Sequence, residues 1–395
     1  MGREQLLALH GAKNDRLIGI DGRVYYDLTS GWNVTNAGWN NEAIFTDWIE
    51  AARALPFRPS WCTDPNQERF KEQLGSIFPG YIPILSCSGS EAIDNALKVA
   101  RVITGRGGVA CVGDAYHGST LGAALAAGYP VDHIDALGLD NRRFALPAPV
   151  SDADLATIEA LLTREDSIGA VVFETVLTNA GCRVVPDAFL NLLQRLSDEF
   201  GFLLVCDEIG TGMNRTGHPW SFQGRPIRPH VITCGKALTN GLYPLSLALV
   251  ANDLRSFLDE ASFASTYGGS PAGCAAALST LAFHQAADLG SRALELASAV
   301  TAIFESNGRK LGGHFDIHGV GLSMAVNIGG GDPEFAHASR PKKIIQSLLE
   351  RGIFAVLSPD GQQLMITPAL TAELEPLMDT LDVVAETIVA SRSVR

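Results

Sequence analysis

Between residues 82 and 250, short apolar runs alternate with segments of helical periodicity, and this alternation limits the fold most. The runs contain few polar residues, which is typical of strands buried on both faces. Strands that alternate with helices over this length favour a mostly parallel sheet covered on both sides. The expected strands are Ile82–Leu85, Val109–Val112, Ile168–Phe173, Phe202–Cys206, Val231–Cys234 and Leu245–Val250, with helices at Ser90–Thr104, Ser151–Leu162 and Asp187–Phe200.

The flanking segments predict a second, smaller α+β part. Residues 17–28 alternate in polarity around Asp21-Gly22, which is a β-hairpin pattern, and we expect this hairpin to join the C-terminal part. The expected division is an N-terminal segment 1–45, a large α/β domain 46–280 and a small domain 281–395. Helices are expected at Glu42–Ala54, Pro65–Ile77, Ala275–His284, Ser291–Asn307, Lys342–Arg351 and Ala372–Ala390, and strands at Gly319–Ile328 and Gln363–Ile366.

Composition argues against several functions. The chain has 395 residues, 46% of them hydrophobic, which is enough for a large core. Its formal net charge of -13 disfavours nucleic acid and anionic membranes as partners, and no apolar run is long enough to span a bilayer. The 7 Cys lack a CxxC pair and no signal peptide is evident, so we expect a reducing, cytoplasmic location. The 9 His lack metal-ligand spacing, and no metal is expected.

One lysine stands at the end of an expected buried strand. The run Val231–Cys234 stops at Gly235, Lys236 follows, and Asn240-Gly241 then breaks any regular element. Desolvation at such a place lowers a lysine pKa, and a neutral amine can form a Schiff base with an aldehyde. The alternative, which is commoner for an isolated lysine, is a side chain that reaches from the strand end to water.

Two motifs could hold a phosphate group. Ser88 and Glu91 match a capping box, so Gly89 and Ser90 are expected at a helix N-terminus, where free N–H groups and hydroxyls suit an anion. A cluster of Thr, Gly and Ser at 265–271 precedes the helix near Gly273 and is the second motif. Taken alone, each motif is better explained as a loop and a helix cap.

Two other strand ends suit an aromatic ligand. Tyr116 and His117 follow the Val109–Val112 strand, where an aromatic ring can lie on a planar ligand. Asp207 follows another buried strand, and a buried carboxylate requires a partner such as a protonated pyridine nitrogen. The alternatives are a surface Tyr and an Asp that caps a turn or binds magnesium. Together with the lysine and the phosphate motifs, these groups describe pyridoxal 5′-phosphate (PLP), and the loop 212–217 could cover its site.

Five stretches follow one another in the chain: SGSEAIDNALKVAR, AYHG, CDEIGTGMNRTG, CGKALTNGLYPL and STYGGSPAGCAAAL. They resemble the motifs of the class III aminotransferases, PLP enzymes of fold type I that include ornithine, acetylornithine and 4-aminobutyrate aminotransferases. The resemblance runs from about Leu17 to Leu370. It implies a seven-stranded sheet in the large domain, PLP as cofactor, and a homodimer with shared active sites.

The resemblance also implies roles for single residues. Lys236 would form the Schiff base and move a proton, and Asp207 would pair with the ring nitrogen. Thr266 would reach the phosphate of the cofactor in the neighbouring subunit. The other implied cofactor contacts are Gly89 and Ser90 at the phosphate, Tyr116 with the adjacent His117 and Ile209 at the two ring faces, and Glu174 in the substrate pocket.

Three departures from the family pattern bear on the substrate. Gly210 stands where many members have a Gln that contacts the ring hydroxyl, and Thr175, Leu177 and Thr178 replace a Pro and a Gln-Gly pair. Met365 occupies the place of an Arg that serves α-carboxylates in many members, and a Met cannot form that bidentate pair. We therefore expect an amine, an aldehyde or a carrier-linked group as substrate, with Arg58 and Arg183 as candidate substitutes for the Arg.

The expected activity is amino transfer between an amine or amino acid donor and a keto or aldehyde acceptor, in a specialised biosynthetic role. A racemase, epimerase, decarboxylase or aminomutase would begin with the same Lys236 imine and is the alternative. A PLP-binding regulator is disfavoured because Lys236 and Asp207 are both present and no DNA-binding module is appended. A dinucleotide-dependent dehydrogenase is disfavoured because no G-x-G-x-x-G follows the first strand of the alternating region.

Overall fold

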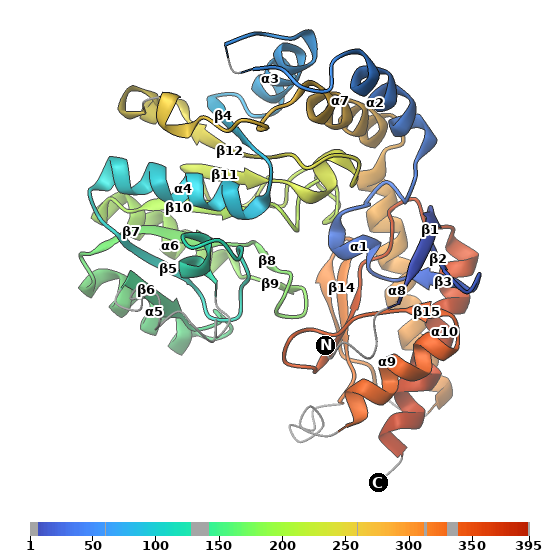
Figure 1. The fold of residues 1–395 in the computed structure, drawn as a ribbon. Coiled ribbons are helices and arrows are strands. Elements are labelled where there is room, and N and C mark those ends of the chain that lie inside the picture. The colour runs from blue at the N-terminus through green and yellow to red at the C-terminus, as the bar shows by residue number, and fades with distance from the viewer. Residues whose placement is uncertain are drawn as a thin grey trace.

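The computed structural model describes residues 7–59, 61–127, 142–258, 260–311, 314–329 and 339–393. Its main feature is a seven-stranded sheet in the order β4-β12-β11-β10-β7-β5-β6 (Figure 1). Within this sheet only β12 runs antiparallel to its neighbours, so the expected mostly parallel sheet is confirmed. The strands are β4 (Tyr81–Ser86), β5 (Gly108–Val112), β6 (Arg143–Leu146), β7 (Ile168–Phe173), β10 (Leu203–Asp207), β11 (Val231–Cys234) and β12 (Ser246–Ala251).

Helices cover both faces of this sheet, which explains why its central strands are apolar throughout. On one face, α4 (Gly89–Thr104) packs its buried side chains onto β5, β7, β10 and β11. On the other face lie α5 (Asp152–Arg164) and α6 (Asp187–Phe200). That face continues under α3 (Pro65–Ile77) and α7 (Pro271–Ala286), and α7 also packs against α2 (Glu42–Ala54).

Caps encoded in the sequence set several helix ends. The Asp64 side chain accepts from the N–H of Gln67 and starts α3. In the expected capping box, Ser88 accepts from the N–H of Glu91, whereas the Glu91 carboxylate reaches the N–H of Cys87 at 2.8 Å. Glycines in the left-handed conformation end α4 and α6. Local chemistry is therefore sufficient to place these boundaries.

The second part of the chain combines both termini around one apolar cluster, drawn from residues 26–44 and 289–388. Figure 1 shows the blue N-terminal strands beside the red helix α10, away from the seven-stranded sheet. The expected hairpin forms as β2 and β3, and the segment expected at 319–328 is the antiparallel pair β13 and β14, separated by Gly321 at φ 53°. The domain limits given above remain a prediction. The elements are β1 (Leu9–Lys13), β2 (Arg16–Gly19), β3 (Val24–Asp27), α8 (Leu289–Leu311), β13 (Ile317–Val320), β14 (Ser323–Asn327), α9 (Arg340–Glu350), β15 (Ile353–Phe354), β16 (Gln363–Ile366) and α10 (Leu374–Ser393).

The described residues contain no helix whose length and apolar character would let it cross a membrane. Nor do they contain a group of three or more His, Cys, Asp or Glu side chains placed to hold a metal ion.

Candidate active site

Lys236 lies on a strained turn at the carboxyl end of β11. Its φ is 44°, a left-handed value that is uncommon for a residue with a side chain. Strain of this kind is concentrated at functional sites, where the surrounding structure holds it in place. Burial lowers the pKa of the lysine, although the charges of Asp207 and Glu174 act in the opposite direction. The turn therefore presents an amine that is partly accessible and less basic than usual, as the sequence predicted.

Asp207 ends β10 beside this lysine and is only 3% exposed. Its Oδ1 accepts from the N–H of Ile209 at 2.9 Å and from Thr233 Oγ1 at 3.1 Å, and its Oδ2 bonds His117 Nδ1 at 2.7 Å. Burial lowers the pKa of His117, but the hydrogen bond and charge of Asp207 raise it more. The carboxylate is thus oriented by partners on three segments. The neighbouring Glu208 instead accepts from Thr211, Ser221 and Phe222 and has a structural role.

Glu174 follows β7 and adds a second carboxyl to the group. Its Oε1 accepts from Thr178 Oγ1 at 2.5 Å, while its buried Oε2 has no partner within the described residues. Burial raises the pKa of Glu174 to about 7, with His117 lowering it and Asp207 raising it. The structure therefore brings Lys236, Asp207, His117 and Glu174 into one electrostatic cluster.

Four residues expected at the phosphate and the ring, Gly89, Ser90, Tyr116 and Ile209, follow the parallel strands β4, β5 and β10, whose carboxyl ends lie at the same edge of the sheet. A Cβ at Gly89 would lie 2.8 Å from Ile209 Cδ1, so the start of α4 packs directly against the residue expected on one ring face. Ser90 Oγ accepts from the N–H of Ser119 at 3.1 Å, which joins the helix start to the Tyr116 loop. Tyr116 is 42% exposed, as is suitable for a ring that covers a ligand.

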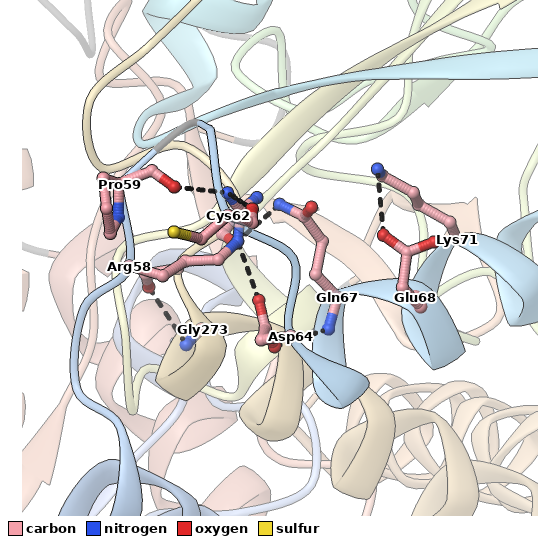
Figure 2. Close-up of polar contacts among 10 residues, drawn as sticks. Arg58, Pro59, Cys62, Asp64, Gln67, Glu68, Lys71 and Gly273 are labelled. Carbon is pink, nitrogen blue, oxygen red and sulfur yellow. Dashed lines mark hydrogen bonds and ion pairs between the residues drawn. The ribbon is translucent and has the colours of Figure 1, made fainter.

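Thr266 and Arg58 lie elsewhere. Thr266 is exposed and lines a cavity of about 510 Å³ that also contains Arg58. Figure 2 shows that Arg58 is already engaged, with Nε 2.8 Å from an oxygen of Asp64 and Nη1 donating to the carbonyls of Pro59 and Cys62. Among the contacts of the described residues, none links Thr266 to the Lys236 cluster.

Arg215 is a residue whose importance sequence reasoning missed. The loop 212–217, expected as a possible cover, is itself largely buried, and Arg215 is fully buried within it. Its guanidinium donates to the carbonyls of Leu322 and Pro368 and to Ser30 Oγ, and burial lowers its pKa to about 9. Ser30 begins α1 (Ser30–Asn33), a turn in which every residue has a positive φ. Arg215 thus ties the β10 loop to a strained turn and to the C-terminal part.

These groups fit PLP. The cluster offers a lysine of lowered pKa, an oriented carboxylate, a half-exposed aromatic ring and a helix start without a side chain at Gly89. The unpartnered polar atoms His117 Nε2 and Glu174 Oε2 are buried beside them, and buried polar atoms in proteins normally have partners. The fold and the site together define a PLP enzyme of fold type I.

Comparisons with known proteins support the same class of enzyme. The profile of the class-III aminotransferases matches residues 2–388. A 2-aminoadipate transaminase from Pseudomonas putida is 28% identical over 96% of this chain and 95% of its own, and a 5-aminovalerate aminotransferase from Pseudomonas aeruginosa is 30% identical over 87% and 84%. An amine transaminase from an uncultivated Pseudomonas species, solved with PLP, shares the fold with a TM-score of 0.88 at 22% identity, covering 98% of this chain and 95% of that one. The chain belongs to the class-III aminotransferase family, and it catalyses PLP-dependent amino transfer.

The raised pKa of Glu174 gives a testable pH dependence. The folded value of about 7 exceeds the ordinary 4.5, so the folded state binds more protons and loses stability as pH rises from 4.5 to 7. Glu174→Gln cannot ionise, and we expect the cofactor-free variant to exceed the wild type in unfolding free energy at pH 8 by roughly 1–3 kcal/mol. Urea unfolding at pH 8 and pH 5 measures this difference, which should shrink at the lower pH. Glu72→Gln on the surface of α3 is the control, and a Glu174→Gln protein no more stable than wild type at pH 8 would contradict the assignment.

Proposed function

We propose that one of the two substrates of this transaminase is an amine, an aldehyde or a carrier-linked group rather than a standard α-amino acid. The observation that carries the proposal is the setting of Met365. This side chain is 4% exposed and packs in an apolar cluster with Val176, Cys182, Ala325 and Val356. An apolar wall of this kind disfavours a carboxylate, which requires a cationic partner when it leaves water.

The alternation of side chains along β16 explains why Met365 packs in that apolar cluster. In β16, Leu364 and Ile366 point into the apolar core of the C-terminal part, so Met365 points to the opposite face. There it meets Val176 of β8 (Val176–Leu177), two positions after Glu174. The Met365 side chain therefore belongs to an apolar cluster that includes Val176, a residue close in sequence to Glu174 of the Lys236 cluster.

Three arginines could in principle bind a substrate carboxylate instead. Arg58 is paired with Asp64, and Arg215 is buried against backbone carbonyls. Arg183, in β9 (Arg183–Val184), is exposed. Arg58 and Arg215 therefore do not replace the missing Arg at Met365, which supports a substrate without an α-carboxylate.

The chain's own residues would act as follows. When bound, PLP supplies a ring that accepts electrons from the bond being broken. Lys236 would hold the cofactor and, once the substrate amine has displaced it, serve as the base beside the acidic proton. Asp207, oriented by His117 and Thr233, would keep the ring nitrogen protonated. Tyr116 and Ile209 would confine the ring, and Gly89 and Ser90 would bind its phosphate.

Met365→Arg tests the substrate proposal. We expect the relative kcat/KM for α-amino acids over simple amines to rise roughly tenfold or more, because the new guanidinium can pair with a carboxylate. A donor screen of wild type and variant measures the ratio, with Met365→Leu as a control that keeps the apolar wall. The proposal fails if wild type already uses ordinary α-amino acids and α-keto acids well and Met365→Arg leaves the ratio unchanged.

A homodimer in the cytoplasm is the second part of the proposal. Large aromatic side chains are exposed around the Thr266 cavity, with Trp61 at 85%, Tyr267 at 59%, and Phe57 5.5 Å from Tyr267 between ring centroids. Exposed apolar patches commonly mark protein interfaces. All seven cysteines are free, which supports a reducing compartment.

Trp61→Arg is expected to weaken this interface and to loosen cofactor binding at the same time, because Thr266 would then no longer reach the neighbouring site. Sedimentation velocity and cofactor titration measure the two effects. A variant that remains dimeric, or a wild type that sediments as a monomer while holding PLP, would refute the shared site.

A further inference from the structure

Gly210 and Thr178 meet beside the Lys236 cluster. Gly210 lies three residues after Asp207, and Thr178 follows the short strand β8. A Cβ at position 210 would lie 3.2 Å from both Cγ2 and Oγ1 of Thr178. Thr178 is 8% exposed, so it has little room to move away. A glycine at 210 therefore gives the Thr178 side chain space that a residue with a Cβ would narrow by a few tenths of an ångström.

The Thr178 hydroxyl has a specific acceptor there. It donates to Glu174 Oε1 at 2.5 Å, and the Thr178 N–H reaches the same oxygen at 3.4 Å. Both bonds fix one oxygen of the carboxyl, while Oε2 is buried and has no partner within the described residues. Hydrogen bonds to the charged form of a carboxyl favour that form. Thr178 therefore orients Glu174 and favours its charged form, in opposition to burial, which raises the pKa of Glu174.

We propose that Thr178 is a positioning residue of this transaminase, which orients Glu174 beside Lys236 and favours its charged form against the effect of burial, and that Gly210 leaves the space that the Thr178 side chain occupies. The proposal rests on Lys236 as the residue that holds the cofactor. A negative charge at Glu174 favours a protonated nitrogen at Lys236 over a neutral one. Loss of the Thr178 donor raises the proton affinity of Glu174, so less negative charge remains near neutral pH and the nitrogen at Lys236 loses its proton more readily.

The pH midpoint of the cofactor's visible absorption band reports this effect without any turnover. Thr178→Val keeps the volume but removes the hydroxyl, and its midpoint should fall by about one pH unit. Thr178→Ser keeps the hydroxyl and should retain the wild-type midpoint. Thr175→Val is the matched control, since Thr175 is also buried one residue after Glu174 but bonds Ser221.

A substitution at Gly210 tests the steric part of the proposal. Gly210→Ala should shift the midpoint in the same direction as Thr178→Val, because its methyl group pushes Thr178 from Glu174. In the Thr178→Ser background, which lacks Cγ2, Gly210→Ala should produce a smaller shift; such non-additivity is expected of residues in contact. A wild-type midpoint in Thr178→Val, an equal shift in Thr175→Val, or a wild-type midpoint in Gly210→Ala would overturn the proposal. Absence of the band in wild type would instead refute the role of Lys236.

Discussion

Replacement of Lys236 by alanine is expected to lower the rate of amino transfer by about four orders of magnitude, because one side chain supplies both the attachment of the cofactor and the base. Lys236 follows β11 and lies beside Asp207 and Glu174, and burial lowers its pKa. The variant should fold, since the hydrogen bonds of this turn among the described residues join backbone atoms, which the substitution leaves in place. Single-turnover kinetics with an amine donor, together with the thermal unfolding midpoint, measure both expectations.

Lys343→Ala, on the exposed side of α9, is the matched control for this loss and should keep wild-type rates. A Lys236→Ala protein with more than a few per cent of wild-type activity would show that another amine does the chemistry.

Replacement of Asp207 by asparagine is the second large expected effect. An amide at this position cannot hold a proton on the ring nitrogen, and we expect kcat to fall by roughly two to three orders of magnitude, as is usual when one preorganised electrostatic group is removed. The fold should tolerate the change because Asn can still accept from Ile209 and Thr233. Stopped-flow measurement of each half-reaction isolates the chemical step from product release.

Glu208→Gln separates this effect from the general loss of a buried carboxylate. Glu208 accepts three hydrogen bonds at 2.6–2.9 Å, so its replacement should cost about 1–3 kcal/mol of stability while preserving the cofactor band. If Asp207→Asn and Glu208→Gln lowered kcat equally, Asp207 would have no particular relation to the cofactor.

The sequence predicted most of the fold because the fold depends on local pattern. The bounds of α2, α3 and α6 follow from caps and helical periodicity and agree with expectation. Asp207 and Lys236 could be assigned to one site from the chemistry of PLP and the resemblance to the class III aminotransferases. That they end neighbouring parallel strands, β10 and β11, is a finding of the structure. Strand β6, by contrast, was not expected, since Arg143–Leu146 is short and opens with an arginine.

Contacts between distant segments could not be predicted in the same way. The contact between Gly210 and Thr178 joins the segment after β10 to the segment after β8, and no pattern within either segment indicates it. The contact from Arg215 to Ser30 spans 185 positions and supports a left-handed turn that sequence patterns did not reveal. Such features require the assembled fold.

The most direct test of the account is to reduce the purified protein with borohydride, which fixes a bound aldehyde to the amine that holds it, and then to map the peptides by mass spectrometry. We predict the mass of the reduced cofactor on the peptide that contains Lys236, and its absence after incubation with an amine donor before reduction. An adduct on a different lysine, or no adduct in protein reconstituted with PLP, would contradict the assignment of this site.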